Sequence, residues 1–417
     1  MSQLTPEDSA VVPKTIAPDI TVFAPPISVP ADVVVDGGSA VARLRFATVV
    51  ALAAIMALSF ELTVRVQDWV RYRMPIFSPV TSEADLMVRD RLGAHGRPNS
   101  QFRQWSIDSL GFRGVDVPVV KGSGTVRVVL TGASETFGLY ESPHREYARA
   151  LEDSLNARLA AGACDTALVR RFEVLNDALP GMSLPTVEQD IRLRLGRFAP
   201  DVIVHYPSPA QYLEDRAPFA TPRDTTAGSH DIHGSLARAL YPRTLDILRD
   251  ALKKAAPEPL LTWLRQRSAQ AEQHQHSASW RFTSIPEERM AEYDSDLRSL
   301  IGDIHSLGAE PILATHATAF ERPRSDSAAL LQAWERFYPR ATGATIIKFD
   351  DGARAATIRA ASDSAVIVAD VAGMFAHTDG ANFADFVHFT DSGSALVAQV
   401  LAPAVLAAAQ RRHECRR

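Results

Sequence analysis

A serine and an aspartate–histidine pair, separated by about 250 positions, carry the side chains that acyl chemistry needs. Ser134 lies in Thr131-Gly-Ala-Ser-Glu-Thr-Phe-Gly138, where two glycines allow a tight turn. Asp385 and His388 have i, i+3 spacing, so the carboxylate could reach the imidazole and fix its tautomer. A serine hydroxyl becomes a nucleophile when such a base removes its proton. We therefore expect Ser134 as nucleophile, His388 as base and Asp385 as the residue that orients the base.

Each motif also has a plainer interpretation. Ser134 could equally be a turn or helix-start serine, because Gly37-Gly-Ser39 and Gly181-Met-Ser183 contain the same G-x-S pattern. The D-x-x-H pattern occurs once in the chain, which is close to what chance would give. Glu135 could be a helix-start acid or a substrate contact, and we expect the former. His316 could approach the site from the end of the fourth strand, and we expect it to be a structural histidine. The two motifs together favour hydrolytic chemistry more than either does alone.

Both motifs lie beside segments that alternate between strand and helix patterns. Apolar, β-branched runs predict strands at residues 126–130, 172–175, 201–206, 311–315 and 365–369. Helical spacing predicts helices at 144–159, 186–198, 284–307 and 390–410. This alternation predicts a flavodoxin-like, three-layer α/β/α domain with a mainly parallel five-stranded sheet. In such sheets the site lies beyond the carboxyl ends of the strands, and the Ser134 segment follows the first of them.

The N-terminal third has a different organisation. Residues 1–40 form a proline-rich tail that we expect to be disordered. Residues 41–66 contain fifteen uncharged residues, Phe46 to Phe60, and extending the helix from 44 to 64 gives about 31 Å, enough to span a bilayer. Residues 67–124 form a juxtamembrane lead-in, and the α/β domain occupies 125–410 with a polar insertion at about 215–283. A cleaved signal peptide and a buried soluble helix are the alternatives to an uncleaved span.

Charge does not decide which side of the membrane the domain occupies. Arg43 and Arg45 precede the span, and Arg65, Arg71 and Arg73 follow it, so the positive-inside count is nearly a tie and leans slightly against export.

Composition excludes several classes of function. The 417 residues carry a net charge of −5, which gives no cationic surface excess for nucleic acid. Two cysteines exclude a disulfide-rich scaffold and a cysteine-rich zinc site. No Walker or G-x-G-x-x-G motif follows a strand, and we expect His230-x-x-His233 and His274-x-His276 to lie in solvated loops. The sequence therefore predicts neither a cofactor nor a metal.

From about residue 100 to 408 the chain resembles the SGNH (GDSL-type) serine hydrolase superfamily. The resemblance rests on Gly132-Ala-Ser-Glu-Thr-Phe-Gly138, Asn176-Asp-Ala-Leu-Pro-Gly181 and Asp385-Phe-Val-His-Phe-Thr-Asp-Ser-Gly393. Asp108-Ser-Leu-Gly-Phe-Arg-Gly114 looks like the segment that precedes the domain in membrane-anchored bacterial members.

The resemblance implies that Ser134 attacks an ester carbonyl, with His388 and Asp385 completing the triad. It also implies that backbone N–H groups of Ser134 and Gly181 face the oxyanion. The chain departs from the family at Ala133, which replaces an acidic residue, and in His205-Tyr-Pro-Ser-Pro-Ala-Gln-Tyr212, which lacks the asparagine of the third block. Losing one oxyanion donor costs about 2.7–4 kcal/mol, and Ser208 or Gln211 is the available substitute.

Two functions follow from these observations. The first is a membrane-anchored serine esterase with a cytoplasmic N-terminus and a periplasmic domain, acting on an acylated glycan or lipid of the envelope. The second is a domain of the same fold with weak or no catalysis, serving as a structural or binding subunit beside partner proteins in a membrane complex. The missing asparagine, the long tail and the insertion favour the second function; the triad residues favour the first.

Overall fold

The computed structural model describes residues 37–165, 168–214, 236–255, 267, 280–322, 325–378, 380–412 and 415. Residues 1–36 of the expected disordered tail, most of the 215–283 insertion and the four histidines of that insertion lie outside the described residues. Residues 37–40, the end of that tail, are helical, so the expectation of disorder is wrong there. The chain divides into two compact units, Met1–Leu58 and Ser59–Arg417.

A single long helix covers the expected membrane span. Helix α1 extends from Gly37 to Tyr72, further than the predicted 41–66, and Ala42–Tyr72 is apolar and long enough to cross a membrane. Its large apolar side chains are exposed, for example Phe46 at 72% and Leu58 at 70%. Helix α12 (Asp391–Arg411) also meets the length and composition criteria, but more than half of it is buried against the sheet. Helix α1 is therefore the candidate membrane span.

The lead-in folds into two small antiparallel ribbons. Strand β1 (Met87–Asp90) pairs with β2 (Gly93–Gly96), and β3 (Gln101–Phe102) pairs with β4 (Trp105–Ser106); a short 3₁₀ turn, η1 (Glu83–Leu86), precedes them. Buried Arg113 joins this segment to the main domain, because its Nε donates to the carbonyl of Phe137 at 2.8 Å and its backbone N–H to that of Asn176.

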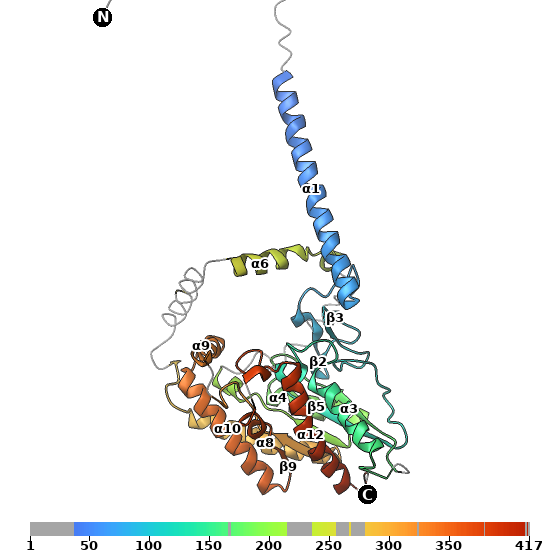
Figure 1. Cartoon of the computed structure of the whole chain (residues 1–417), viewed down its shortest axis with the longest axis vertical. Helices are drawn as coiled ribbons and strands as arrows, with labels where there is room; N and C mark the ends of the chain where they lie inside the picture. The colour runs from blue at the N-terminus through green and yellow to red at the C-terminus, as the bar shows by residue number, and fades with distance from the viewer. Residues whose placement is uncertain are drawn as a thin grey trace, which may run out of the picture. The chain divides into compact units, whose positions relative to one another are not determined.

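The main domain is built on a parallel sheet of five strands (Figure 1), as the sequence predicted. The strands are β5 (Thr125–Thr131), β6 (Arg171–Asn176), β7 (Val202–His205), β8 (Glu310–Ala314) and β9 (Ile367–Ala369). Their spatial order, β6-β5-β7-β8-β9, is the flavodoxin-like order, and every pair is parallel. The carboxyl ends of the strands consequently meet at one edge.

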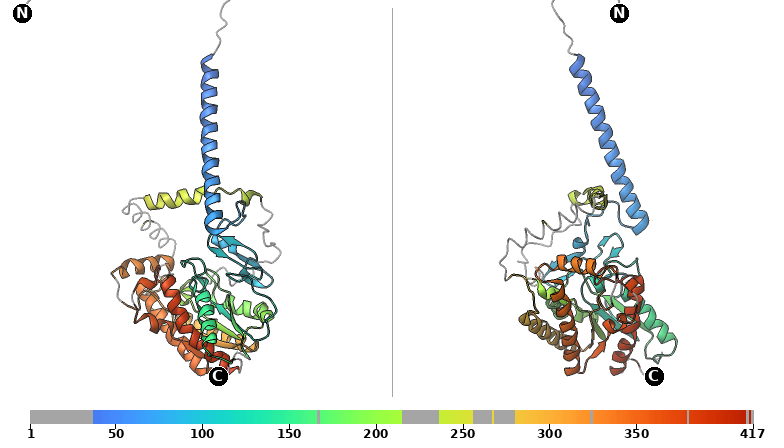
Figure 2. Two further views of the ribbon diagram at one scale, coloured as in Figure 1. Left: turned by 45° about the vertical axis from the view of Figure 1, so that its right-hand side comes forward. Right: turned by 60° about the vertical axis from the view of Figure 1, so that its left-hand side comes forward.

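Helices cover both faces of the sheet and create two apolar cores (Figure 2). One core contains α3 (Tyr147–Ala160), α11 (Val371–Phe375) and α12; the other contains α4 (Leu184–Leu193), α8 (Glu287–Ser306) and α10 (Gly343–Asp363). Alternate residues of β5 point to opposite cores, with Val128 in the first and Val129 in the second. Helix α9 (Ser327–Phe337) adds Trp334 to the second core.

The predicted helix 186–198 is wrong in its bounds. Helix α4 begins earlier, at Leu184, with Ser183 at its N-cap, and it ends at Leu193; a separate 3₁₀ turn, η2, covers Leu195–Phe198. The break falls at Arg194, whose buried guanidinium pairs with Asp190 and Asp177. A buried arginine needs several carboxylate and carbonyl partners, and Asp190, Asp177 and the Leu110 carbonyl supply them here.

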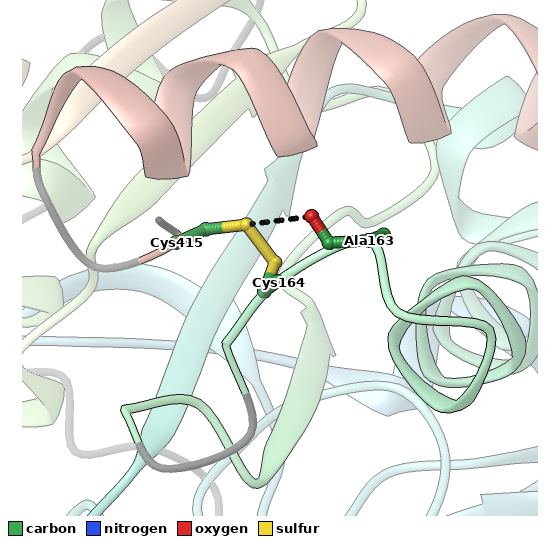
Figure 3. Close-up of a disulfide and its surroundings, with 3 residues drawn as sticks. All are labelled: Ala163, Cys164 and Cys415. Carbon is green, nitrogen blue, oxygen red and sulfur yellow. Dashed lines mark hydrogen bonds between the residues drawn. A yellow bond between two sulfur atoms is a disulfide. The ribbon is translucent and has the colours of Figure 1, made fainter. Parts of the chain in front are cut away.

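A disulfide joins Cys164 to Cys415 across 251 positions (Figure 3). Cys164 lies in the connection between α3 and β6, and Cys415 follows α12, so the bond joins two segments that flank the same face of the sheet. The sequence analysis excluded a scaffold held by many disulfides and did not predict this single pair.

Candidate active site at the carboxyl edge of the sheet

Ser134 is the first residue of a one-turn helix, α2 (Ser134–Phe137), that follows β5 directly. Gly132 is required in the turn, since a Cβ there would lie 2.2 Å from Thr136 Oγ1 and 2.7 Å from the Tyr206 carbonyl. Gly138 ends the helix in the left-handed region at φ +78°. Asn176 Nδ2, at the end of β6, donates to the Thr136 carbonyl at 2.8 Å. The neighbouring strands therefore hold the serine at the edge of the sheet.

His388 and Asp385 form the pair that their spacing predicted. Asp385 Oδ2 lies 2.7 Å from His388 Nδ1, and Asp385 Oδ1 accepts the N–H groups of Val387 and His388 at 2.9 Å each. With Nδ1 committed to the carboxylate as a donor, Nε2 is the nitrogen available as a base. This Nε2 is buried and has no hydrogen-bond partner within the described chain.

The Ser134 hydroxyl is not turned toward this imidazole. Its Oγ donates to Glu135 Oε2 at 3.3 Å, and no hydrogen bond between Ser134 and His388 is present in the described part of the molecule. Burial lowers the pKa of His388, but the hydrogen bond to Asp385 and the charge of Glu135 outweigh it and raise the pKa above its usual value. The Glu135 carboxylate thus interacts with the hydroxyl and with the imidazole.

Glu135 belongs to a buried polar network that extends across three strand ends. Ser208 Oγ, after β7, donates to Glu135 Oε1 at 3.0 Å, and His316 Nε2, after β8, lies 3.6 Å from the same oxygen. His316 Nδ1 is 2.5 Å from Asp350 Oδ1, on α10. Glu135 lies in the first turn of α2, as expected of a helix-start acid, and it is buried, with 2% of its surface exposed.

The network favours the charged forms of Glu135 and His316. Burial raises the pKa of Glu135, but His316 and His388 outweigh this effect and lower it to about 2. Burial lowers the pKa of His316, but Asp350 and Glu135 outweigh it and raise the pKa to about 10. Arg354 continues the network with a 2.6 Å contact to Glu321 and a 3.5 Å contact to Asp350. His316 is therefore a cation between two anions, as a structural histidine with defined partners.

The residues expected to bind the oxyanion lie around the same edge. Gly181 occupies the turn between β6 and α4 at φ +77°, and the following residue, Met182, lines a small pocket with Gly132, Ala133, Tyr206, Ser208 and Gln211. The Ser208 hydroxyl donates to Glu135, whereas Gln211 Nε2 donates one hydrogen to the Met182 carbonyl at 3.3 Å. Gln211 keeps a second amide hydrogen, and a serine hydroxyl has only one.

Among the described residues, no cluster of three or more His, Cys, Asp or Glu side chains could hold a metal ion.

The chain is similar to several solved hydrolases. LAE5, an alpha/beta hydrolase enzyme from the metagenome of Lake Arreo, Spain, is 16% identical, with a TM-score of 0.38, over 68% of this chain and 95% of that one. The lipase/acylhydrolase from Enterococcus faecalis is 16% identical over 68% and 96%, with a TM-score of 0.36. A GDSL-like lipase from Bacteroides thetaiotaomicron is 10% identical over 68% and 88%, with a TM-score of 0.37.

No protein-family model and no curated protein matches the sequence. At 10–16% identity and TM-scores below 0.5, these likenesses leave the activity to be argued from the site itself.

Sequence reasoning missed Asp350, Arg354 and Glu321. His316 was noticed because it follows a strand, but its carboxylate partner lies 34 positions later on a helix that the sequence did not predict. A histidine at a strand end is the only signal that could have suggested such a network.

Replacing His316 with asparagine tests the network through its pH dependence. Removing one partner of a buried ion pair costs about 3–5 kcal/mol, which we expect as the loss in unfolding free energy near pH 6. Because the folded pKa of His316 is about 10, above its ordinary 6.5, its stabilising contribution is complete below pH 6.5 and disappears as the pH rises through 10. Urea denaturation of both proteins from pH 6 to 10 measures this difference.

The matched control is His305→Asn, at an exposed histidine in the last turn of α8, which should change stability little at any pH. A deficit of His316→Asn that stays constant up to pH 10 would contradict a charged His316.

Proposed function

We propose that this chain is a membrane-anchored serine hydrolase of the SGNH type that cleaves acyl esters with Ser134, His388 and Asp385. One observation carries the proposal. His388 is held through Nδ1 by Asp385, and its Nε2 is buried and unpartnered in the described chain, at the sheet edge where Ser134 follows β5. A fixed imidazole with one free basic nitrogen is the arrangement that activates a serine hydroxyl.

The reaction begins with a rotation of the Ser134 side chain from Glu135 toward His388, between staggered rotamers. His388 Nε2 then accepts the hydroxyl proton while Oγ attacks the ester carbonyl, and the backbone N–H groups of Ser134 and Gly181 bind the oxyanion. The protonated imidazole next gives its proton to the leaving alcohol. Water repeats the sequence on the acyl-serine and restores both residues.

Glu135 and His316 have opposite electrostatic effects on this reaction. The Glu135 carboxylate favours the imidazolium of His388, which forms as Ser134 loses its proton. The same negative charge opposes the oxyanion. The His316 cation on the other side of Glu135 reduces this unfavourable effect, so the pair supports proton transfer at a smaller cost to the oxyanion.

The third oxyanion donor is assigned to Gln211. Its side-chain amide lines the pocket beside Gly132 and Ala133, and one of its hydrogens is not used in the bond to Met182. Ser208 gives its single hydroxyl hydrogen to Glu135, so its role is to hold that carboxylate.

The domain is assigned to the outside of the cytoplasmic membrane. The arginine count around the span is nearly a tie, but the Cys164–Cys415 disulfide favours an oxidising compartment. A tethered enzyme in that compartment meets acylated glycans and lipids of the envelope, and we propose these as the substrate class.

The second function, a catalytically inactive subunit of a membrane complex, has one observation in its favour. In the structure the Ser134 hydroxyl donates to Glu135 and not to His388. Active-site labelling separates the two functions.

Replacing Ser134 with alanine tests the catalytic proposal. We expect the full chain in detergent to react with a fluorophosphonate probe and to hydrolyse p-nitrophenyl acetate, and Ser134→Ala to lose labelling and about 10⁴-fold or more in kcat/KM. The control is Ser295→Ala, on the exposed surface of α8, which should retain both. A folded wild-type chain that neither labels nor hydrolyses the ester supports the inactive-subunit function.

Comparing Gln211→Ala with Ser208→Ala tests the third donor. Loss of an oxyanion donor costs about 10²–10³-fold in kcat, and we expect this loss for Gln211→Ala with little change in KM. Ser208→Ala should cost less, because it removes only a hydrogen bond to Glu135. A larger effect at Ser208 than at Gln211 would reverse the assignment.

The oxidation state of Cys164 and Cys415 tests whether the domain lies outside the cytoplasm. Cysteines of the chain isolated from its native membrane under acid quench should resist alkylation until a reductant is added, as mass spectrometry can measure. Replacing both Cys164 and Cys415 with serine should lower the unfolding free energy by about 2–5 kcal/mol. Alkylation of both thiols without reductant would contradict an extracytoplasmic domain.

A further inference from the structure

Residues 236–255 of the insertion contain an amphipathic helix with an exposed apolar face. Helix α6 (Thr244–Ala255) follows the short α5 (Leu236–Ala239), and Leu245, Leu248 and Leu252 repeat at helical spacing along one side of it. These leucines are 51%, 55% and 62% exposed. Leu236 of α5 and Leu240, which follows it, are also exposed, at 72% and 55%. Exposed leucines in one continuous stripe indicate a surface that meets an apolar partner.

The start of α6 is attached to the C-terminal part of α1. Arg243 Nη1 forms an ion pair with Asp68 Oδ2 at 3.0 Å. Arg65 of α1 donates to the carbonyls of Ala239 at 2.8 Å and Tyr241 at 2.7 Å, in the turn between α5 and α6. Arg65 is only 4% exposed, so these bonds are shielded from water.

Glu61 determines where along α1 the first turn of α6 is attached. It directly follows Phe60, the last residue of the uncharged run in α1. Its carboxylate accepts the backbone N–H groups of Arg243 at 3.1 Å and Thr244 at 3.0 Å, and it pairs with Arg65 at 2.5 Å. A carboxylate at the N-terminal end of a helix satisfies N–H groups that have no partner within the helix and interacts favourably with its dipole.

The position of Glu61 at the end of the apolar segment of α1 indicates that the apolar face of α6 meets lipid. A span that contains Phe46 to Phe60 leaves the hydrocarbon at about Glu61, because a charged group is stable only near the bilayer interface. The first turn of α6 is bonded to that same residue, so its leucines start at the level of the lipid headgroups. Arg249, exposed on the same helix, adds a positive charge suited to anionic headgroups.

We propose that α6 is an interfacial helix that lies on the membrane crossed by α1, with Leu245, Leu248 and Leu252 inserted among the lipids. The proposal rests on the membrane anchoring within the proposed function and is independent of catalysis. Amphipathic helices of this kind bury their apolar face about 5–10 Å into the boundary between headgroups and acyl chains. With α6 on the membrane surface, the domain would contact the bilayer at two places, α1 and α6. Two contacts define its orientation to the bilayer better than the span alone.

The position of the insertion connects this surface to the active site. The insertion leaves the domain after η3 (Pro209–Leu213), which carries Gln211. A helix held on the membrane therefore lies in the connection that follows Gln211, which lines the small pocket beside Gly132 and Ala133.

Depth-dependent fluorescence quenching in vesicles tests the proposal. The full-length protein, with its disulfide intact, is labelled with bimane at Leu248→Cys, Leu252→Cys or Asp246→Cys and reconstituted into phosphatidylcholine–phosphatidylglycerol vesicles. Asp246 lies on the opposite side of the helix and is the matched control. We expect lipids brominated at shallow acyl positions to quench the probes at 248 and 252 at least about twofold more than the probe at 246.

Equal, weak quenching at all three positions would overturn the proposal. Burial of the 248 probe without quenching by lipid would also overturn it, in favour of a protein partner or a second copy of the chain. Flotation of the same vesicles at high salt measures the α1 anchor separately. A chain that floats with an unquenched 248 probe refutes the α6 proposal alone, whereas a chain that does not float refutes the anchoring itself. Fluorophosphonate labelling of Ser134 reports catalysis independently of both.

A further variant tests the attachment to α1. Arg243→Ala removes the ion pair to Asp68, and we expect it to reduce lipid quenching at position 248 by about half or more. Arg249→Ala, on the same helix, is the control and should preserve most of the quenching. Equal effects of the two variants would show that general charge, and not the attachment to α1, holds the helix at the surface.

Discussion

The carboxylate of Glu135 is buried and charged, and the loops at three strand ends are arranged to make this possible. A buried anion is stable only with nearby donors and cations, because leaving water costs several kcal/mol. Ser134, Ser208 and His316 supply those partners from the ends of β5, β7 and β8. The parallel register of the strands brings the three residues to one place. The requirement to neutralise Glu135 therefore helps to define the edge at which His388 also lies.

Much of the architecture was predictable because the residues of each main strand form an apolar pattern that can be recognised within that strand alone. β-Branched runs such as Val126–Leu130 are buried on both faces, and this burial leaves a continuous apolar signal. The Asp385–His388 pair was predictable for the same reason, since three residues are enough to close its hydrogen bond. A pattern of neighbouring residues indicates contacts between residues that are close in the sequence. Once the strands and helices are known, only a few strand orders are compatible with right-handed crossovers, and the flavodoxin-like order is one of them.

Other features depend on contacts that no local pattern encodes. Helix α10 was missed because its buried face is built largely from alanine and threonine, such as Ala353, Ala356 and Thr357, which give a weak apolar period. Asp350 was missed with it, so the partner of His316 had no visible source. Arg194, where α4 ends, pairs with Asp177 from a different segment, a contact that no local pattern reports. The Ser134–Glu135 hydrogen bond joins neighbours in sequence, yet its importance comes from the distant residues around Glu135.

The disulfide has a consequence for biogenesis. Cys164 precedes Cys415 by 251 positions, and the sheet strands β6 to β9 and the helix α12 lie between them. During N-to-C translocation, Cys164 would emerge long before its partner and remain a single reduced thiol throughout most of the passage. On the proposed placement of the domain outside the cytoplasm, oxidation occurs only once the segment after α12 has arrived, so the disulfide forms late, after nearly the whole domain has been exported.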